Sequence, residues 1–339
     1  MALAFALLFA ATIMQGSYPI LMKKYDPFSW EAFWLVYNVA LVIIVFIYAG
    51  FCIPNFMDYV MDDAVRPQVI TTFVLGIFQG VASIALAQAI VRIGASMTWG
   101  INQGVSLLVG SIAPMFILGR FPDSTALPVL IIGLIALMIA VFLLTKAGYM
   151  RDNAAEKSEA TEDAAKKSGS GFVLALFLAV LAGMGGAAIN MCLSMNDAIV
   201  QLAVGDGVDA ASATCLTWVI LFSGSFIPNL LFAGQKLIKN KTFGDFTAPG
   251  CGMAWFKSIA CVSIALCGMF IYGRITYMLG DLGPVVGWII FNGVSMIVNN
   301  IWSYRDHEWD GNPAAKKVSL IGNVAVVIAV VVVGIANGL

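Results

Sequence analysis

Long uninterrupted runs of apolar residues recur along this chain and are separated by short polar stretches. A helix needs roughly 20 apolar residues to cross the hydrocarbon core of a bilayer, whereas the strands of a membrane barrel alternate apolar and polar positions. The pattern therefore predicts an all-α integral membrane protein with ten transmembrane helices. The ten runs are residues 2–22, 31–52, 69–91, 96–118, 126–146, 171–195, 212–234, 255–279, 283–303 and 317–337.

Composition strengthens this interpretation. Of the 339 residues, 60% are hydrophobic and only 11% are charged. An average soluble domain is about 25% charged, so an ordinary soluble enzyme is excluded. The formal net charge is −1, and this lack of a basic excess argues against a nucleic-acid partner. We expect the lipid bilayer to be the main environment of the chain.

The distribution of basic residues predicts an orientation. Of the 18 Lys and Arg residues, 14 lie in the odd-numbered loops and 2, Arg66 and Arg120, in the even-numbered loops. Basic residues accumulate in cytoplasmic loops, so both termini should be periplasmic or extracellular. The charged, Ala-rich stretch 148–170 would then be a cytoplasmic linker between two five-helix parts, residues 1–147 and 171–339.

An internal repeat relates the two parts. WGINQGVSLLV at 99–109 matches WIIFNGVSMIV at 288–298, and Ile-Pro-Asn occurs at 53–55 and at 227–229. These matches pair the second span with the seventh and the fourth with the ninth. Because five is odd, two such repeats insert with opposite orientation, which is typical of secondary transporters with a site near the bilayer midplane. Chance similarity between apolar segments is the alternative.

Polar side chains inside the spans are the candidates for a substrate site. They are costly at bilayer depth unless they face a cavity or a partner. Amides and hydroxyls bind sugar hydroxyls, and Trp rings stack on sugar faces, but the same groups also serve as interhelical hydrogen-bond partners and interface anchors. We predict substrate contacts for Tyr18, Gln79, Trp99, Asn102, Gln103, Ser106, Arg274, Trp288, Asn292 and Ser295; Tyr37, Asn38 and Asn190 are further polar residues in the spans.

Two charged residues need separate consideration. Arg274 is the one fully embedded basic residue, and it would bind an anionic group, pair with a carboxylate, or extend to the surface near Asp281. No carboxylate lies in the middle of a span. Glu31, which opens the second span beside Trp30 and Trp34, is the best candidate for a proton-coupling residue, ahead of Asp197 and Asp281.

Signatures of catalysis are missing from the sequence. The chain has one His, and it lacks a P-loop, an HExxH and a GxSxG motif. The six Cys include no CxxC pair, so we expect them to be packing residues. We expect no enzyme activity, no metal site and no cofactor.

Several short motifs occur in order along essentially the whole chain: SWEAFW (29–34), IPNF (53–56), GASMTWGINQGVSLLVGSIAPMFILGRF (94–121), TKAG (145–148) and EW (308–309) followed by a basic pair. Together they resemble the bacterial L-rhamnose–proton symporter family of the drug/metabolite transporter superfamily. The resemblance implies two inverted five-span repeats. It also implies proton-coupled import of a monosaccharide such as L-rhamnose by alternating access through the bacterial inner membrane.

Departures from the family pattern leave alternatives open. Asn102 and Gln103 stand where the family has a Gly-rich aliphatic segment, and Arg274 where it has an uncharged aromatic run. An acidic sugar or another metabolite is therefore an alternative substrate, and an exporter of the same superfamily is an alternative carrier. A membrane-embedded enzyme or sensor is the alternative from another class.

Overall fold

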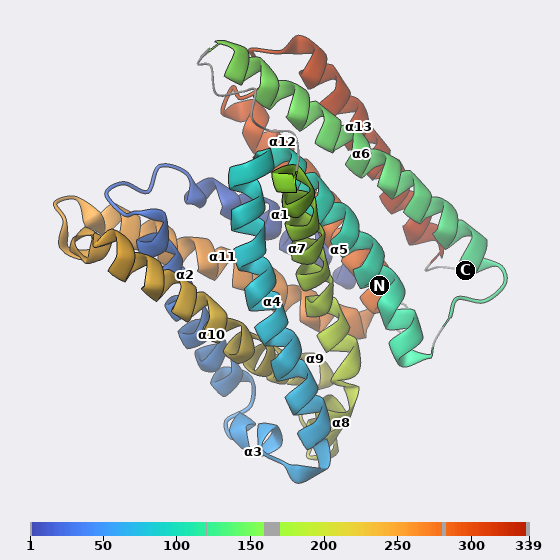
Figure 1. The fold of residues 1–339 in the computed structure, drawn as a ribbon. Coiled ribbons are helices and arrows are strands. Elements are labelled where there is room, and N and C mark those ends of the chain that lie inside the picture. Colours follow the sequence, from blue (N-terminus) through green and yellow to red (C-terminus); the bar gives the residue numbers. More distant parts are fainter. Residues whose placement is uncertain (1, 120, 159–169, 280–282, 337–339) are drawn as a thin grey trace. The chain divides into compact units, whose positions relative to one another are not determined.

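Every regular element in the described part of the chain is a helix (Figure 1). The computed structural model describes residues 2–119, 121–158, 170–279 and 283–336. The long helices are α1 (Ala2–Ser17) with η1 (Tyr18–Met22), α2 (Trp30–Cys52), α4 (Arg66–Ile93), α5 (Ala95–Leu118), α6 (Ala126–Ser158), α7 (Ser170–Met195), α10 (Cys215–Asn240), α11 (Cys251–Met278), α12 (Gly283–Arg305) and α13 (Pro313–Ala336). The short ones are α3 (Phe56–Val60), η2 (Asp63–Val65), α8 (Asp197–Gly205), α9 (Ala210–Ala213) and η4 (Thr242–Thr247).

Among the described residues, ten helical segments are long and apolar enough to cross a membrane, which confirms the predicted spans. The seventh span extends beyond its predicted end at residue 234, because α10 continues to Asn240 and carries Lys236 and Lys239 in its last turns. Lysines at the C-terminus of a helix interact favourably with its dipole and extend their ammonium groups to water. α6 continues to Ser158, into the predicted linker, while Arg120, Lys166, Lys167 and Asp281 lie outside the described residues.

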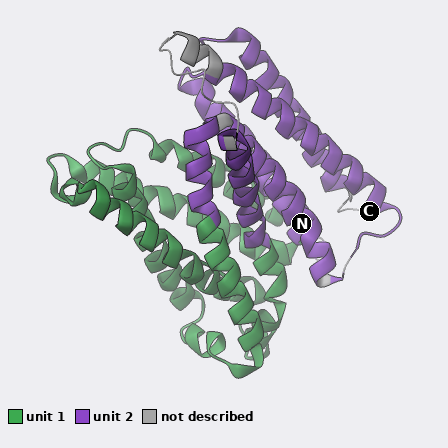
Figure 2. Ribbon diagram, viewed as in Figure 1, with its two compact units in different colours: residues 1–81, 191–283 green, residues 82–190, 284–339 purple. Residues whose placement is uncertain are grey.

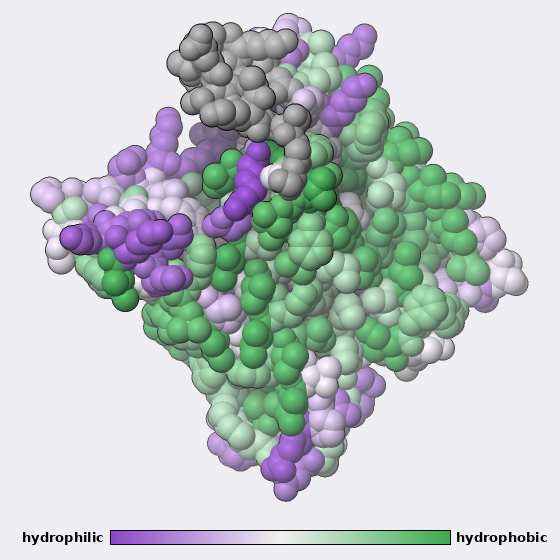
Figure 3. Space-filling model, in the orientation of Figure 1, coloured by the Kyte–Doolittle hydropathy of each residue, from purple (hydrophilic) through white to green (hydrophobic). Residues whose placement is uncertain are grey.

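The long helices expose large apolar side chains, as expected for a lipid-facing surface. Ile47 of α2 and Val324 of α13 are each more than half exposed. On the face drawn in Figure 3, hydrophobic residues cover the helices and hydrophilic residues gather towards helix ends and loops. A soluble protein rarely exposes such continuous apolar surface, so the bilayer is the solvent of this chain.

The chain forms two compact units (Figure 2). The first comprises residues 1–81 and 191–283, and the second residues 82–190 and 284–339. In the first unit α2 packs against α10 and α11, and α1 packs against α11; in the second, α6 packs against α5 and α13. Each unit thus combines helices from the N-terminal and C-terminal parts of the chain. The inverted relation of residues 1–147 and 171–339 stays a prediction.

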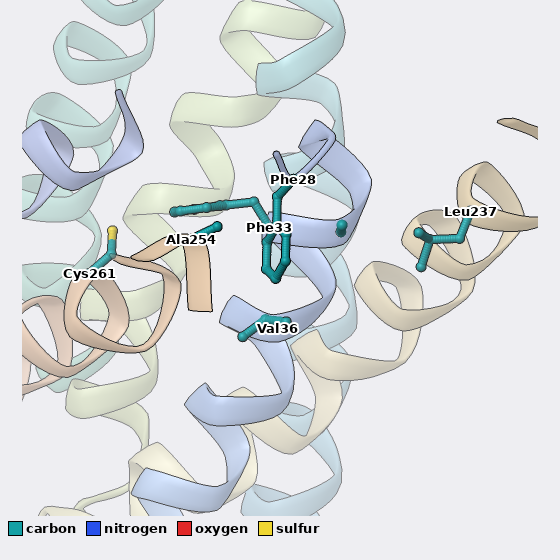
Figure 4. Close-up of a cluster of buried hydrophobic side chains, with 7 residues drawn as sticks. Phe28, Phe33, Val36, Leu237, Ala254 and Cys261 are labelled. Atoms are coloured by element: carbon teal, nitrogen blue, oxygen red, sulfur yellow. The ribbon is translucent and has the colours of Figure 1, made fainter. Parts of the chain in front are cut away.

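A buried apolar cluster fixes the start of α2 in the first unit (Figure 4). Phe28 and Phe33 pack with Leu237 of α10 and with Ala254 and Cys261 of α11. Phe28 also meets the rings of Phe246 and Trp255 edge-on. These contacts hold the first turns of α2 in place, and those turns carry Glu31, the candidate proton-coupling residue.

Two glycines let α4 and α10 approach backbone to backbone. A Cβ at Gly76 would lie 2.1 Å from the carbonyl oxygen of Leu221, and a Cβ at Gly224 would lie 2.2 Å from that of Phe73. Real Cβ atoms do not approach backbone oxygens this closely. The sequence Gly76 to Gly80 on α4 therefore determines how near its polar residue, Gln79, lies to α10.

Replacing Gly224 by alanine is expected to lower the thermal unfolding midpoint of the detergent-solubilised protein by several degrees. The added methyl group must push α4 away from α10, and overpacking of this kind costs about 1–3 kcal/mol. Gly234→Ala on the same helix is the matched control, because a Cβ there meets open space. Differential scanning fluorimetry checks both variants, and equal midpoints for the two would contradict the close packing.

Candidate functional site

Three aromatic rings form a stack along one face of α2. The ring centroids of Trp30 and Trp34 are 5.5 Å apart with an interplanar angle of 15°, and those of Trp34 and Tyr37 are 5.3 Å apart at 3°. Positions 30, 34 and 37 follow the i, i+4, i+7 spacing that aligns side chains on a helix. The stack presents apolar ring faces beside polar N–H and O–H groups.

A chain of hydrogen bonds connects this stack to α10 and α4. The Trp34 indole N–H donates to Oδ1 of Asn229 at 2.9 Å, and the Asn229 amide donates to the Ser225 carbonyl oxygen at 2.9 Å. The Ser225 hydroxyl donates to Oε1 of Gln79 at 2.5 Å. Polar groups are thus brought together from three helices. We call this set the Trp34–Asn229 site; it consists of Trp30, Trp34, Tyr37, Gln79, Ser225 and Asn229.

The sequence predicted part of this set. Gln79 is one of the predicted substrate contacts, and Tyr37 is one of the further polar residues in the spans. The sequence does not predict Ser225 or Asn229, and it indicates Trp34 only as a neighbour of Glu31. The signal for Asn229 was present, because it is the Asn of the second Ile-Pro-Asn repeat at 227–229.

Glu31 lies in the first turn of α2, next to Trp30 of the site. Its side chain is only 6% exposed, and Oε1 accepts hydrogen bonds from the Asn240 amide at 2.8 Å and the Thr242 hydroxyl at 2.9 Å. Outside the spans, burial raises the pKa of the Tyr25 phenol, and the carboxylates of Asp26 and Glu31 raise it further. Among the described residues, both side-chain donors to the Glu31 carboxylate, Asn240 and Thr242, are neutral groups.

A second group of predicted residues lies in the second unit. The Trp288 indole N–H, on α12, donates to the Ser106 carbonyl oxygen of α5 at 3.0 Å, and the ring presses against Gly110. Trp288 is 3% exposed. Asn292 and Ser295 are buried and donate to carbonyl oxygens of their own helix, at 3.1 and 2.7 Å.

The remaining residues of this group lie on α5. The Asn102 amide donates to Oε1 of Gln103 at 3.3 Å, and Asn102 is buried while Trp99 is 36% exposed. Gly183 and Gly186 of α7 bring that helix against Asn102 and Ser106: a Cβ at Gly183 would lie 2.7 Å from the Asn102 carbonyl oxygen.

Asn190 ties the helices of the second unit together. Its amide donates to the carbonyl oxygens of Gly110 on α5 and Pro284 on α12, both at 2.7 Å. Unlike the side chains of Asn102 and Gln103, this one bridges two other helices. Asn190 therefore acts as an interhelical hydrogen-bond donor, the structural role that embedded amides commonly have.

Arg274 and Tyr18 lie apart from the Trp34–Asn229 hydrogen-bond chain. An Nη atom of Arg274 donates to the Ser212 hydroxyl at 3.0 Å, and the other lies 3.6 Å from Oδ2 of Asp209. The Arg274 side chain is 43% exposed, so it pairs with a carboxylate near solvent. Tyr18 lies in η1, where its carbonyl oxygen accepts from the Cys261 thiol at 3.5 Å.

Comparison with known proteins gives matches over nearly the whole chain. The family model described as "L-rhamnose-proton symport protein (RhaT)" matches residues 1–338. An L-rhamnose-proton symporter of Mannheimia succiniciproducens is 24% identical over 331 residues, covering 93% of this chain and 92% of that protein. One from Escherichia coli is 23% identical over 331 residues, covering 92% and 91%, and one from Shigella boydii is 26% identical over 223 residues, covering 65% and 62%. This chain therefore belongs to the L-rhamnose-proton symport family, whose members are transporters and not enzymes.

Proposed function

We propose that this protein imports a neutral monosaccharide, L-rhamnose or a related deoxysugar, together with a proton through the bacterial inner membrane by alternating access. The observation that carries the proposal is the family match over residues 1–338. The relatives carry the name L-rhamnose-proton symporter at 23–26% identity, and their substrate supports the class of sugar proposed.

The chemistry of the Trp34–Asn229 site supports a sugar. Trp and Tyr ring faces pack against the apolar face and methyl group of a deoxysugar, while precisely placed amides and hydroxyls bind its hydroxyl groups. Tyr18 and the second-unit residues remain proposed additional contacts. Those residues are Trp99, Asn102, Gln103, Ser106, Trp288, Asn292 and Ser295.

We propose an orientation with both termini periplasmic and segment 148–170 cytoplasmic. The clustering of basic residues in odd-numbered loops and the ten spans support it. In this orientation Glu31 faces the cytoplasmic end of the first unit. Its neutral donors, Asn240 and Thr242, hold a carboxylate that gains or loses a proton without breaking an ion pair.

Uptake by proteoliposomes tests the proposal. Labelled L-rhamnose, other deoxysugars, hexoses and uronates are offered with and without an inward proton gradient. We expect the gradient to drive accumulation of a neutral deoxysugar above its external concentration. Failure of every sugar to move would refute the sugar carrier, and accumulation independent of the gradient would refute proton coupling.

Arg274→Gln separates neutral from acidic substrates. Because the guanidinium already pairs with Asp209 in a half-exposed position, its removal should change the KM for a neutral sugar by no more than about fivefold, as expected for an ion pair worth about 0–1 kcal/mol. An acidic sugar bound by Arg274 would instead lose tenfold or more in uptake. Competition by uronates against the labelled neutral sugar, in both proteins, gives the measurement.

A further inference from the structure

An apolar groove runs between α5 and α6 in the second unit. Its volume is about 480 Å³, and all eight residues that line it are apolar. Leu108 and Ile112 belong to α5, and the other six, which include Leu134 and Met138, belong to α6. A sugar needs amides or hydroxyls to bind its hydroxyl groups. This lining therefore suits a hydrocarbon chain and not the transported solute.

The packing of α5 on α6 explains where the groove begins. A Cβ at Gly100 would overlap the Thr145 side chain of α6, and a Cβ at Gly104 would lie 3.4 Å from Cγ1 of Val141. Residues four apart lie on the same face of a helix. The next such position on α5 is Leu108, which lines the groove. The groove thus begins where the glycines that permit close packing end.

The rim of the groove is an exposed stripe on α6. Ile131, Ile135, Ile139 and Phe142 line the groove, and each is between 47% and 66% exposed. At 1.5 Å per residue, the stripe from 131 to 142 is roughly 16 Å long. This length is about half of the roughly 30 Å hydrocarbon core of a bilayer, which is the part that the acyl chains of one leaflet occupy.

A basic and an aromatic residue continue this stripe beyond Phe142. Lys146 and Tyr149 follow at the i+4 and i+7 positions, and both are exposed. The stretch from Ala126 to Lys146 is one bilayer crossing of roughly 20 residues. The Lys146 ammonium group is therefore expected at the membrane surface, where basic and aromatic side chains contact lipid headgroups.

The Lys146 side chain is available to bind a phosphate. Its neighbour Ala147 is fully buried, whereas Lys146 is exposed. Arg151, further along α6, already pairs with Asp152 at 3.0 Å and with Glu308 at 2.9 Å. Within the described residues, Lys146 forms no ion pair with a carboxylate. An anionic group from outside the chain would supply the missing partner.

A second copy of the chain fits this face less well than a lipid. A twofold dimer in a membrane brings the same residues of both copies together at the same depth. Two Lys146 ammonium groups would then approach each other, and like charges repel. Membrane helices also associate through small residues, whereas this stripe presents Ile and Phe.

We propose that the groove between α5 and α6 binds one acyl chain of an anionic phospholipid whose phosphate contacts Lys146 and whose headgroup contacts Tyr149. In the orientation proposed above, this end of α6 is cytoplasmic, and the cytoplasmic leaflet carries anionic lipids. The eight lining residues are separate from the proposed sugar contacts. The lipid site therefore goes beyond the proposed transport function and does not depend on it.

The test uses the detergent-solubilised full-length protein and phosphatidylglycerol with a photoactivatable diazirine in one acyl chain. Peptide mass spectrometry should locate the adducts in residues 108–112 and 131–142, and unlabelled phosphatidylglycerol should compete better than phosphatidylcholine. Lys146→Gln should lower this labelling about fivefold, as expected for one lysine at an anionic membrane surface. Lys239→Gln, at an exposed lysine near the end of α10, is the matched control that should retain it.

A second pair of variants tests the groove itself. Ile112→Trp places a larger side chain in the groove and should reduce the labelling at least as much as Lys146→Gln. Ile328→Trp is its matched control, because Ile328 is 56% exposed on α13 and lies outside the groove. Both replacements keep an apolar side chain on a lipid-facing helix, so the fold should survive.

Two results would overturn the proposal. Equal labelling by photoactivatable phosphatidylglycerol and phosphatidylcholine, unchanged in Lys146→Gln and Ile112→Trp, would mean bulk lipid only. Efficient cross-linking of two chains through Ile135→Cys would assign the face to a second copy. Sugar uptake, measured separately, distinguishes this inference from the proposed function: labelling without uptake would refute transport alone, and uptake without labelling would refute the lipid site alone.

Discussion

Trp34→Ala is expected to reduce sugar uptake by roughly 10- to 100-fold, the largest effect of any single replacement in the Trp34–Asn229 site. The ring stacks on both Trp30 and Tyr37, and its N–H donates to Asn229. Aromatic contacts are worth about 0.5–1.5 kcal/mol each beyond area burial, and a hydrogen bond about 1 kcal/mol. The loss of one such aromatic contact with the sugar and of one hydrogen bond, about 1.5–2.5 kcal/mol together, corresponds to one to two factors of ten in affinity.

The conservative variant separates stacking from hydrogen bonding. Trp34→Phe keeps a ring between Trp30 and Tyr37 but removes the donor to Asn229, so it should retain an intermediate uptake. Trp302→Ala on α12 is the control for losing a tryptophan elsewhere, since that ring lies under the Arg305 guanidinium near a helix end. Initial rates are normalised to protein in the membrane. Wild-type uptake by Trp34→Ala would eliminate the stack as the sugar-binding surface.

Glu31→Gln is expected to abolish accumulation of sugar against its gradient while leaving sugar exchange in place. The amide keeps an oxygen that accepts from Asn240 and Thr242, so the packing of α2 against α10 should survive. What disappears is the group that binds and releases a proton at this end of the unit. Coupling and translocation therefore separate, and the steady-state ratio of internal to external sugar should fall to about one.

Two measurements on one preparation check this result. Gradient-driven accumulation reports coupling, and counterflow of labelled sugar against unlabelled sugar reports translocation alone. Asp245→Asn is the matched control, because its carboxylate accepts the Ser29 backbone N–H at 2.7 Å at the start of the same helix and an asparagine oxygen can replace it. Full accumulation by Glu31→Gln would assign the coupling proton to another group.

The spans were predictable because each follows from local composition. A run of about 20 apolar residues determines a membrane helix whatever surrounds it. The predicted ends of the helices agree less well with the structure. α10, for example, extends to Asn240 because its terminal lysines are favourable at a helix C-terminus. For the site, the sequence predicted the type of residue but not which residues contact one another. The cost of embedding polar groups identified Gln79, but nothing near Gln79 in sequence indicated its partner Ser225, which lies 146 positions away.

By itself, the sequence determined that this protein is a ten-span helical membrane protein, and its motifs pointed to the family. It also selected the embedded amides and, ahead of Asp197 and Asp281, the carboxylate of Glu31 near a span end as the unusual residues. Only the tertiary structure decided which side chains meet: Trp34 with Asn229, and Glu31 with Asn240 and Thr242. The physical reason is that hydropathy acts along the chain, whereas these contacts depend on which helix faces pack together, and glycines such as Gly76 and Gly224 permit that approach.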